Sequence, residues 1–279
     1  MNETLAYLKQ ALGNQNSPEE VRSLIHLIMK KVCRLEPHQL FLDKDKDLSD
    51  AEKAEIRSIV QRLSRQEPIQ YILGETLFYG YRFRVTPAVL IPRPETEELV
   101  ERIIREEKTE RLQVLDIGTG SGCIAVSLAR QLNQASVWAM DISEEALSVA
   151  RENAKRNLAE VTFLQMDVLQ AEPELPGKLD LLVSNPPYVM NGEKQAMEQN
   201  VLNYEPHQAL FVSDNDPLVF YRAIADLGRR LLKEGGRLYL EINAALGKET
   251  LDVLKERQYK ECQLEKDLSG KDRMIKAIR

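Results

Sequence analysis

Cysteine and histidine are scarce in this 279-residue sequence, with three of each. Cys33, Cys123 and Cys262 are widely separated and form no CxxC pair or metal-ligand spacing. The sequence therefore predicts neither a disulfide framework nor a zinc site, and it favours a reducing compartment. The N-terminal region has no signal-peptide core, and no apolar run is long enough to cross a bilayer. We expect a cytoplasmic protein that has no bound metal and makes no membrane contact.

An excess of basic residues is also missing. The net charge is −6, and the excess of acidic residues lies after residue 85. An acidic surface repels a phosphate backbone, so we expect no direct binding of nucleic acid. Apolar residues make up 43% of the chain, which is enough for a sizeable core. The length fits one large and one small domain.

Residues 1–72 have the pattern of a small helical bundle. Capping boxes begin at Ser17 and Ser49, and each precedes an apolar stripe with helical spacing. Residues 73–93 then predict a β-hairpin connector, with Gly80 between two aromatic-rich strands. The bundle is either a packing unit or a module that holds a macromolecular partner, and composition does not choose between the two.

From residue 94 to residue 279 the pattern changes to alternating strands and helices. Strands are expected at 112–117, 137–141, 161–166, 179–184, 237–242, 260–265 and 273–278, and helices at 123–132, 144–157, 217–232 and 244–256. This order predicts an α/β class fold with a doubly wound, seven-stranded, Rossmann-like sheet. Ligands in such sheets bind beyond the carboxyl ends of the strands. A long polar loop at 189–216 is expected beside the ligand.

A glycine-rich turn leaves the first strand of this domain at Asp116 and reads DIGTGSG. Glycine permits positive φ and lets the backbone approach a ligand closely. The dinucleotide fingerprint GxGxxG would need glycine at position 123, where this chain has Cys123. The spacing DxGxGxG is instead typical of enzymes that use S-adenosylmethionine (AdoMet). The cofactor-binding residues predicted in this turn are Gly118, Thr119, Gly120, Ser121 and Gly122.

Acidic residues follow the next two strands. Asp141 ends the second strand, where a carboxylate can accept hydrogen bonds from both hydroxyls of a ribose. Asp167 and Val168 follow the third strand, where they would meet the amine and the ring of adenine. Each aspartate could instead cap a helix. The ordered set of features at the carboxyl ends of consecutive strands nevertheless predicts an AdoMet site.

The segment Ser184-Asn185-Pro186-Pro187-Tyr188 follows the fourth strand. Prolines cannot donate to a sheet, so they end the strand and stiffen an elbow. A planar group that carries an NH2 fits this elbow, because the freed carbonyls accept its hydrogens and the ring of Tyr188 can stack on it. Hydrogen bonds to the Asn185 side-chain oxygen and the Pro186 carbonyl would activate the nitrogen and stabilise its developing charge. Adenine N6, cytosine N4, guanine N2 and glutamine N5 all satisfy this description.

The chain resembles the bacterial class I methyltransferases that modify a glutamine of peptide chain release factors. The matching segments are 68–75, 78–80, 90–97, 115–125, 184–188, 204–206 and 209–210, with Tyr221 and Arg222. The resemblance implies that Gly118–Gly122, Asp141, Val168 and Asn185 contact AdoMet. It also implies that Asn185, Pro186, Pro187 and Tyr188 hold the acceptor, which is the glutamine of the Gly-Gly-Gln motif in class 1 release factors. In this family a helical N-terminal domain is expected to recognise the substrate. Asn243 departs from the pattern, since relatives often have glycine there.

Three other functions remain open. A sister activity would methylate a glutamine of a ribosomal protein. A nucleic-acid amino methyltransferase would need a basic recognition region, which neither half of the chain shows. A non-catalytic AdoMet-binding module would retain the cofactor without transferring the methyl group, and the intact elbow argues against it.

Overall fold

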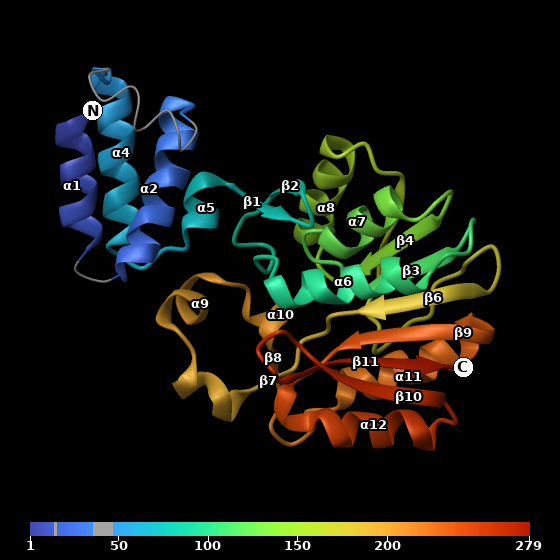
Figure 1. Ribbon diagram of the computed structural model, residues 1–279. Helices are drawn as coiled ribbons and strands as arrows, with labels where there is room; N and C mark the ends of the chain where they lie inside the picture. Colours follow the sequence, from blue (N-terminus) through green and yellow to red (C-terminus); the bar gives the residue numbers. More distant parts are fainter. Residues whose placement is uncertain (14–15, 36–46) are drawn as a thin grey trace. The chain divides into compact units, whose positions relative to one another are not determined.

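The computed structural model describes residues 1–13, 16–35 and 47–279. The chain forms two compact units, one made of residues 1–74 and 199–204 and the other of residues 75–198 and 205–279 (Figure 1). The hairpin expected as a connector thus groups with the larger unit. Residues 14–15 and 36–46 of the expected helical domain lie outside the described residues.

Amphipathic helices build the smaller unit. They are α1 (Asn2–Leu12), α2 (Pro18–Cys33), α4 (Asp50–Leu63), α5 (Ile69–Leu73) and α9 (Gln199–Tyr204). Leu8, Ile28 and Ile56 come from three of these helices, and each is at most 1% exposed within one apolar cluster. In α1, α2 and α4 apolar residues recur every three or four positions, so each of these helices presents one stripe to this core.

Both capping boxes are present. The Ser49 side chain accepts a hydrogen bond from the Glu52 amide, and the Ser49 amide donates to Glu52 Oε2 at 2.7 Å. Ser17 and Glu20 make the same reciprocal pair at the start of α2. These bonds satisfy amides that have no partner within the helix, and they fix where α2 and α4 begin.

Replacement of Ser49 by alanine tests the second box. Loss of an N-cap costs about 1 kcal/mol, so the amides of α4 should exchange with solvent roughly five times faster. Hydrogen exchange followed by mass spectrometry on the peptide covering 50–63 measures this effect. Ser58→Ala is the matched control, because Ser58 is exposed in the middle of the same helix and alanine is the better helix former. Equal exchange in the two variants would contradict the capping role.

An antiparallel hairpin opens the larger unit. Its strands are β1 (Glu75–Phe78) and β2 (Tyr81–Arg84). Tyr79 and Gly80 form the two-residue turn with φ values of 48° and 77°, the positive pair that a type I′ turn requires. Phe78 and Phe83 are buried in an edge-to-face pair, with ring centroids 5.9 Å apart, and they join the main core. The hairpin is therefore a packed part of this unit.

The sheet of the larger unit has the strand order β10-β11-β9-β6-β3-β4-β5 (Figure 1). Its strands are β3 (Gln113–Ile117), β4 (Ser136–Asp141), β5 (Val161–Gln165), β6 (Leu179–Ser184), β9 (Leu232–Glu241), β10 (Lys260–Lys266) and β11 (Asp272–Ile278). The pairs from β5 to β9 are parallel, while β11 runs antiparallel to both of its neighbours. This confirms the doubly wound α/β fold and its seven strands.

Helices cover both faces of the sheet. One face packs against α6 (Pro94–Glu106), α7 (Cys123–Gln131) and α8 (Glu144–Arg156), and the other against α11 (Val219–Leu231) and α12 (Gly247–Glu256). Successive residues of β6 alternate between the faces, with Leu181 and Val183 in one cluster and Leu182 in the other. Both faces are apolar because both are buried, as expected for parallel strands.

The chain changes direction in the sheet at β3. From β3 it proceeds outward through β4 to β5, and it then returns to place β6 on the opposite side of β3. Such a switch point opens a crevice at the carboxyl ends of the central strands. The glycine-rich turn and the elbow leave the neighbouring strands β3 and β6 at this crevice.

Some boundaries differ from those expected. Strand β9 begins at Leu232, because an irregular stretch around Gly235 (φ 75°) precedes its regular pairing from Arg237. The expected loop at 189–216 contains short elements: β7 (Val189–Met190), η1 (Asn191–Ala196), α9, α10 (His207–Leu210) and β8 (Phe211–Val212). Parallel pairing of β7 with β8 orders this connection.

Within the described ranges, every helix is too short or too polar to cross a bilayer.

Candidate active site

A cavity of about 470 Å³ lies at the carboxyl ends of the central strands. Its volume suits a cofactor-sized ligand. The predicted residues that line it are Gly118, Thr119, Gly120, Ser121, Asp141, Asp167, Val168, Asn185, Pro186 and Pro187. Gly122 and Tyr188 also belong to the predicted set, but the structure does not place them in the lining. Most of the residues predicted from four different strand ends therefore meet at one cavity.

The glycine-rich turn is held open by backbone contacts. Gly118 and Gly120 have φ values of 71° and 54°, a conformation that glycine adopts without strain. The amides of Gly118 and Thr119 both donate to the Met140 carbonyl, at 2.8 and 3.0 Å. The turn is thereby tied to the end of β4, and its backbone faces the cavity.

Two aspartates hold this turn through hydrogen bonds. Asp116 is fully buried and accepts a hydrogen bond from the Thr119 hydroxyl at 2.6 Å. Burial raises the pKa of Asp116 to about 7. Asp141 accepts from the Gly120 amide at 2.8 Å and from the Ser143 amide at 3.0 Å. Burial raises the pKa of Asp141, and these two amides oppose that shift. Asp116 therefore supports the turn, whereas Asp141 reaches the cavity.

Gly122 contributes packing. Its φ is 79°, and a Cβ at this position would lie 3.1 Å from the Cβ of Ala150 on α8. Asn153, one turn further along α8, donates to the Ser121 carbonyl and to the Arg84 carbonyl, each at 2.9 Å. The turn, helix α8 and the hairpin are thus fixed to one another at this point.

The elbow lies against the glycine-rich turn. The Ser184 hydroxyl donates to the Ile117 carbonyl at 2.7 Å, which joins the ends of β6 and β3. The Asn185 carbonyl lies 3.8 Å from where a Cβ of Gly118 would be. Since both segments line the same cavity, a methyl donor held by the turn would face an acceptor held by the elbow.

A buried hydrogen-bond network supports the elbow from behind. Asn185 Nδ2 donates to Thr96 Oγ1 at 3.2 Å, and the Thr96 hydroxyl donates to Glu241 Oε2 at 2.6 Å. The Tyr188 hydroxyl donates to Glu241 Oε1 at 3.1 Å. Burial raises the pKa of Glu241, and these two hydroxyl donors oppose the shift. Tyr188, which the sequence predicts to hold the acceptor, is thus fixed through its hydroxyl by Glu241.

The structure adds residues that the sequence had not selected. Residues 88–90, Pro92, Arg93 and Thr96 line the cavity next to the elbow. Arg93 pairs with the buried carboxylate of Glu205, with 2.5 Å between Nη2 and Oε1, and the Ile91 amide donates to the same carboxylate at 3.1 Å. The signal in the sequence is Arg93 between Pro92 and Pro94, since two prolines fix the backbone on either side of it. Its closeness to the elbow depends on packing that periodicity does not report.

Asn243 closes the network on its far side. Its Nδ2 donates to the Tyr188 carbonyl at 3.0 Å and to Glu193 Oε2 at 2.9 Å. The asparagine that departs from the family pattern therefore supports the last residue of the elbow.

Among the residues that the structure describes, no three His, Cys, Asp or Glu side chains are grouped to bind a metal ion.

The fold and the cavity together define a methyltransferase of the AdoMet-dependent type. Residues 95–210 match the family model described as "Methyltransferase small domain". A solved structure of the same fold is the Thermus thermophilus 16S rRNA N2 G1207 methyltransferase in complex with AdoMet and guanosine, which has a TM-score of 0.56 and 22% sequence identity. The match covers 74% of this chain and 49% of that one, and it supports the fold alone.

The family follows from the sequence matches. Residues 3–74 match the model described as "PrmC N-terminal domain". A release factor glutamine methyltransferase from Bacteroides thetaiotaomicron is 49% identical over 279 residues, which is 100% of both chains. A protein-(glutamine-N5) methyltransferase (release factor-specific) from Alicyclobacillus acidocaldarius is 32% identical and has a TM-score of 0.43, with 71% of this chain and 99% of that one covered. This chain belongs to the release factor glutamine methyltransferase family.

Proposed function

We propose that this protein transfers the methyl group of AdoMet to the side-chain nitrogen (N5) of a glutamine in class 1 peptide chain release factors. The glutamine is that of the Gly-Gly-Gln motif. The observation that carries the proposal is the Asn185-Pro186-Pro187 elbow at the same cavity as the glycine-rich turn, in a chain of this family. The helical unit of residues 1–74 is proposed to recognise the release factor.

The cavity fits AdoMet. Gly118 and Gly120 present bare backbone to the cavity, so a ligand can approach the turn closely. Asp141 offers a carboxylate at the end of β4, where ribose hydroxyls can donate to it. Val168, beside the end of β5, offers an apolar contact for adenine. AdoMet, when bound, supplies an electrophilic methyl group on a sulfonium.

The elbow prepares the acceptor nitrogen. A carboxamide nitrogen is a poor nucleophile because its lone pair is delocalised into the carbonyl. The Asn185 side-chain oxygen and the Pro186 carbonyl can each accept one of its two hydrogens, which directs the lone pair away from both acceptors. The same acceptors stabilise the positive charge that develops on nitrogen during transfer. The resulting cation is acidic, so its proton can pass to water without a strong base, and catalysis rests mainly on positioning.

A panel of acceptors tests this function. The protein is incubated with methyl-labelled AdoMet and, separately, with unmodified class 1 release factor, ribosomal proteins, ribosomal RNA and DNA. Label transferred to the release factor and to none of the others is the expected result. Transfer to a ribosomal protein or to nucleic acid, with the release factor unlabelled, would overturn the proposal in favour of that acceptor. A release factor with the motif glutamine changed to glutamate should remain unlabelled.

Asp141→Asn should weaken AdoMet binding. The two oxygens of Asp141 accept hydrogen bonds from the Gly120 and Ser143 amides. Asparagine has an NH2 group in place of one oxygen, and an NH2 group cannot accept hydrogen bonds from an amide or from a ribose hydroxyl. Loss of a charge-assisted hydrogen bond costs about 1.5–3 kcal/mol, which corresponds to a roughly 10–100-fold rise in Kd. Isothermal titration calorimetry measures it, with Asp252→Asn on the exposed side of α12 as the control. An unchanged Kd for Asp141→Asn would remove this residue from the cofactor site.

A further inference from the structure

The side-chain amide of Asn185 can face the cavity in two ways. One presents the oxygen, which accepts a hydrogen bond from the acceptor nitrogen. The other presents the NH2 group, which would repel it. Because the two ends of the amide have nearly the same shape, packing alone discriminates weakly between them. A group outside the cavity must therefore fix the orientation through hydrogen bonding.

Thr96 provides that contact. Asn185 Nδ2 donates to Thr96 Oγ1 at 3.2 Å, which leaves Oδ1 on the opposite side of the planar amide. A threonine hydroxyl has one hydrogen, and in this network that hydrogen is directed to Glu241 Oε2 at 2.6 Å. Thr96 can therefore only accept from Asn185, and an amide oxygen pointed at Thr96 would find no donor.

Glu241 determines the direction of this chain of bonds. Its side chain lies at the carboxyl end of β9 and is 1% exposed. An ionised carboxylate only accepts hydrogen bonds, so both hydroxyls that reach it must donate. Oε2 receives Thr96, and Oε1 receives Tyr188 at 3.1 Å. The Glu241 carboxylate thus contacts Tyr188 directly and Asn185 through Thr96.

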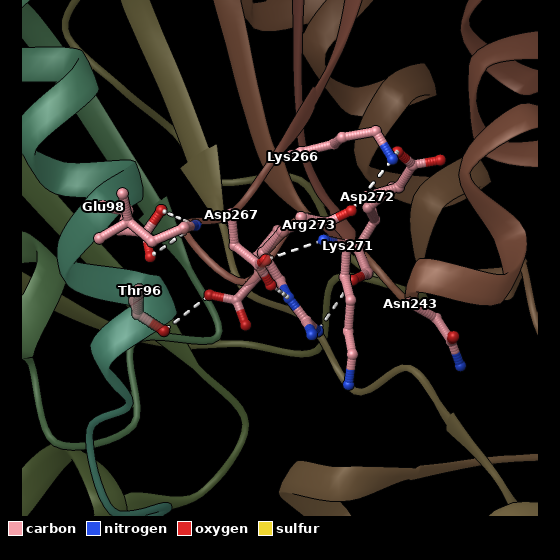
Figure 2. A network of polar contacts seen from close by, with 12 residues as sticks. Thr96, Glu98, Asn243, Lys266, Asp267, Lys271, Asp272 and Arg273 are labelled. Carbon is pink, nitrogen blue, oxygen red and sulfur yellow. Dashed lines mark hydrogen bonds and ion pairs between the residues drawn. The ribbon is translucent and has the colours of Figure 1, made fainter.

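A cation on β11 compensates the buried charge. Arg273 Nη1 donates to the Tyr188 hydroxyl at 3.4 Å, and Arg273 Nε pairs with Asp267 at 3.3 Å. Figure 2 shows Thr96, Asp267 and Arg273 in this network, with a dashed contact leading from the Thr96 hydroxyl. The charge of Arg273 favours the ionised form of Glu241 and so lowers the free-energy cost of burying that carboxylate. The Tyr188 hydroxyl lies between the two groups, so both carboxylate oxygens remain available to the hydroxyl donors.

We propose that Glu241 is a positioning residue, which acts through Thr96 to hold Asn185 with its side-chain oxygen directed at the acceptor nitrogen. This inference rests on the proposed glutamine methylation and specifies how the chain orients its hydrogen-bond acceptor. Glutamine at position 241 would reverse the direction of the hydrogen bond between residues 241 and 96, because its NH2 group can donate to the Thr96 hydroxyl. The Thr96 hydroxyl would then be free to donate to Asn185 Oδ1, and the amide of Asn185 would turn over.

Three variants test the relay in the full-length protein. Glu241→Gln and Thr96→Val should each lower kcat about 10–100-fold, the range for groups that orient a contacting residue, with the AdoMet Kd within about twofold of wild type. Thr96→Ser keeps the hydroxyl and should restore most of the activity lost in Thr96→Val. The controls are Glu249→Gln, an exposed carboxylate, and Thr250→Val, a buried threonine on α12 whose hydroxyl bonds to the Leu246 carbonyl. Both controls should keep wild-type kcat.

A measurement without substrate separates this inference from the proposed function. In the free protein, NMR should show a nuclear Overhauser effect between the Asn185 side-chain NH2 and the Thr96 methyl group. Glu241→Gln should remove that contact, while the backbone amide chemical shifts in the rest of the larger unit should stay as in the wild-type protein. Retention of the contact together with wild-type kcat in Glu241→Gln would overturn the relay. A wild-type protein that shows the contact but methylates no release factor would overturn the function and leave the orientation of Asn185 intact.

Discussion

Replacement of Asn185 by alanine is expected to lower kcat for glutamine methylation about 10³-fold while AdoMet binding largely survives. The side chain lines the cavity, and its Nδ2 is engaged by Thr96, which leaves Oδ1 to accept a hydrogen from the acceptor nitrogen. Its removal takes away one of two acceptors that shape the nucleophile, an interaction that strengthens as positive charge develops. Single-turnover methyl transfer and calorimetric AdoMet binding measure the two effects separately.

Two companions sharpen this test. Asn215→Ala removes an exposed asparagine from the connection after the elbow and should leave kcat unchanged. Asn185→Asp keeps the size of the side chain, but a carboxylate cannot donate to Thr96, so this variant should also be slow. Turnover near the wild-type rate in Asn185→Ala would show that the elbow acts through its backbone carbonyls, and the side-chain oxygen would then have no part in activating the nucleophile.

The second large effect is on stability and comes from Gly122→Ala. The residue has φ of 79°, and its new methyl group would lie 3.1 Å from the Cβ and 3.3 Å from the Cα of Ala150. A left-handed conformation costs alanine about 1–2 kcal/mol, and overpacking adds about 1–3 kcal/mol, so a loss of roughly 2–5 kcal/mol is expected. Trp138 is the single tryptophan and lies on β4, so its fluorescence during urea unfolding reports on the larger unit.

Gly120→Ala is the matched comparison. Gly120 has φ of 54°, and an added Cβ would meet no protein atom within 4 Å. This variant therefore carries the conformational cost of about 1–2 kcal/mol without the packing cost. Since Gly120 lines the cavity, its methyl group should weaken AdoMet binding, whereas the Gly122 variant should lose stability first. Equal unfolding free energies for the two variants would contradict the separation of a cofactor-facing glycine from a packing glycine.

The parts of the fold that the sequence predicted well depend on local chemistry. The capping boxes at Ser17 and Ser49 and the positions along the chain of the seven strands in the large sheet follow from side-chain patterns within short windows. The same applies to Gly118 and Asn185, because each sits at the end of a recognisable strand. Local sequence patterns do not predict which segments pair when the chain folds back on itself. The pairing of β7 with β8 inside the 189–216 connection is an example.

The missed site residues illustrate the same limit. Glu241 lies in a predicted strand and Thr96 lies in the first turn of α6, and nothing in either neighbourhood of the sequence indicates that their side chains are 2.6 Å apart. The sequence predicts that Tyr188 holds the acceptor, because an aromatic ring follows the two prolines. It does not indicate that the Tyr188 hydroxyl donates to Glu241 or that the ring packs against the apolar cluster that includes Tyr221 and Leu240. Long-range polar contacts of this kind depend on tertiary packing, which periodicity does not encode.

Tandem mass spectrometry of the modified substrate tests the central claim most directly. Unmodified class 1 release factor is treated with the protein and AdoMet, digested and sequenced, and the labelled peptide is then hydrolysed in acid. One methyl group on the glutamine of the Gly-Gly-Gln motif, released on hydrolysis as methylamine, is the expected result, because it places the methyl on the side-chain nitrogen. A methyl group on another residue, or one released as methanol from a carboxyl oxygen, would contradict an elbow built to activate a carboxamide nitrogen.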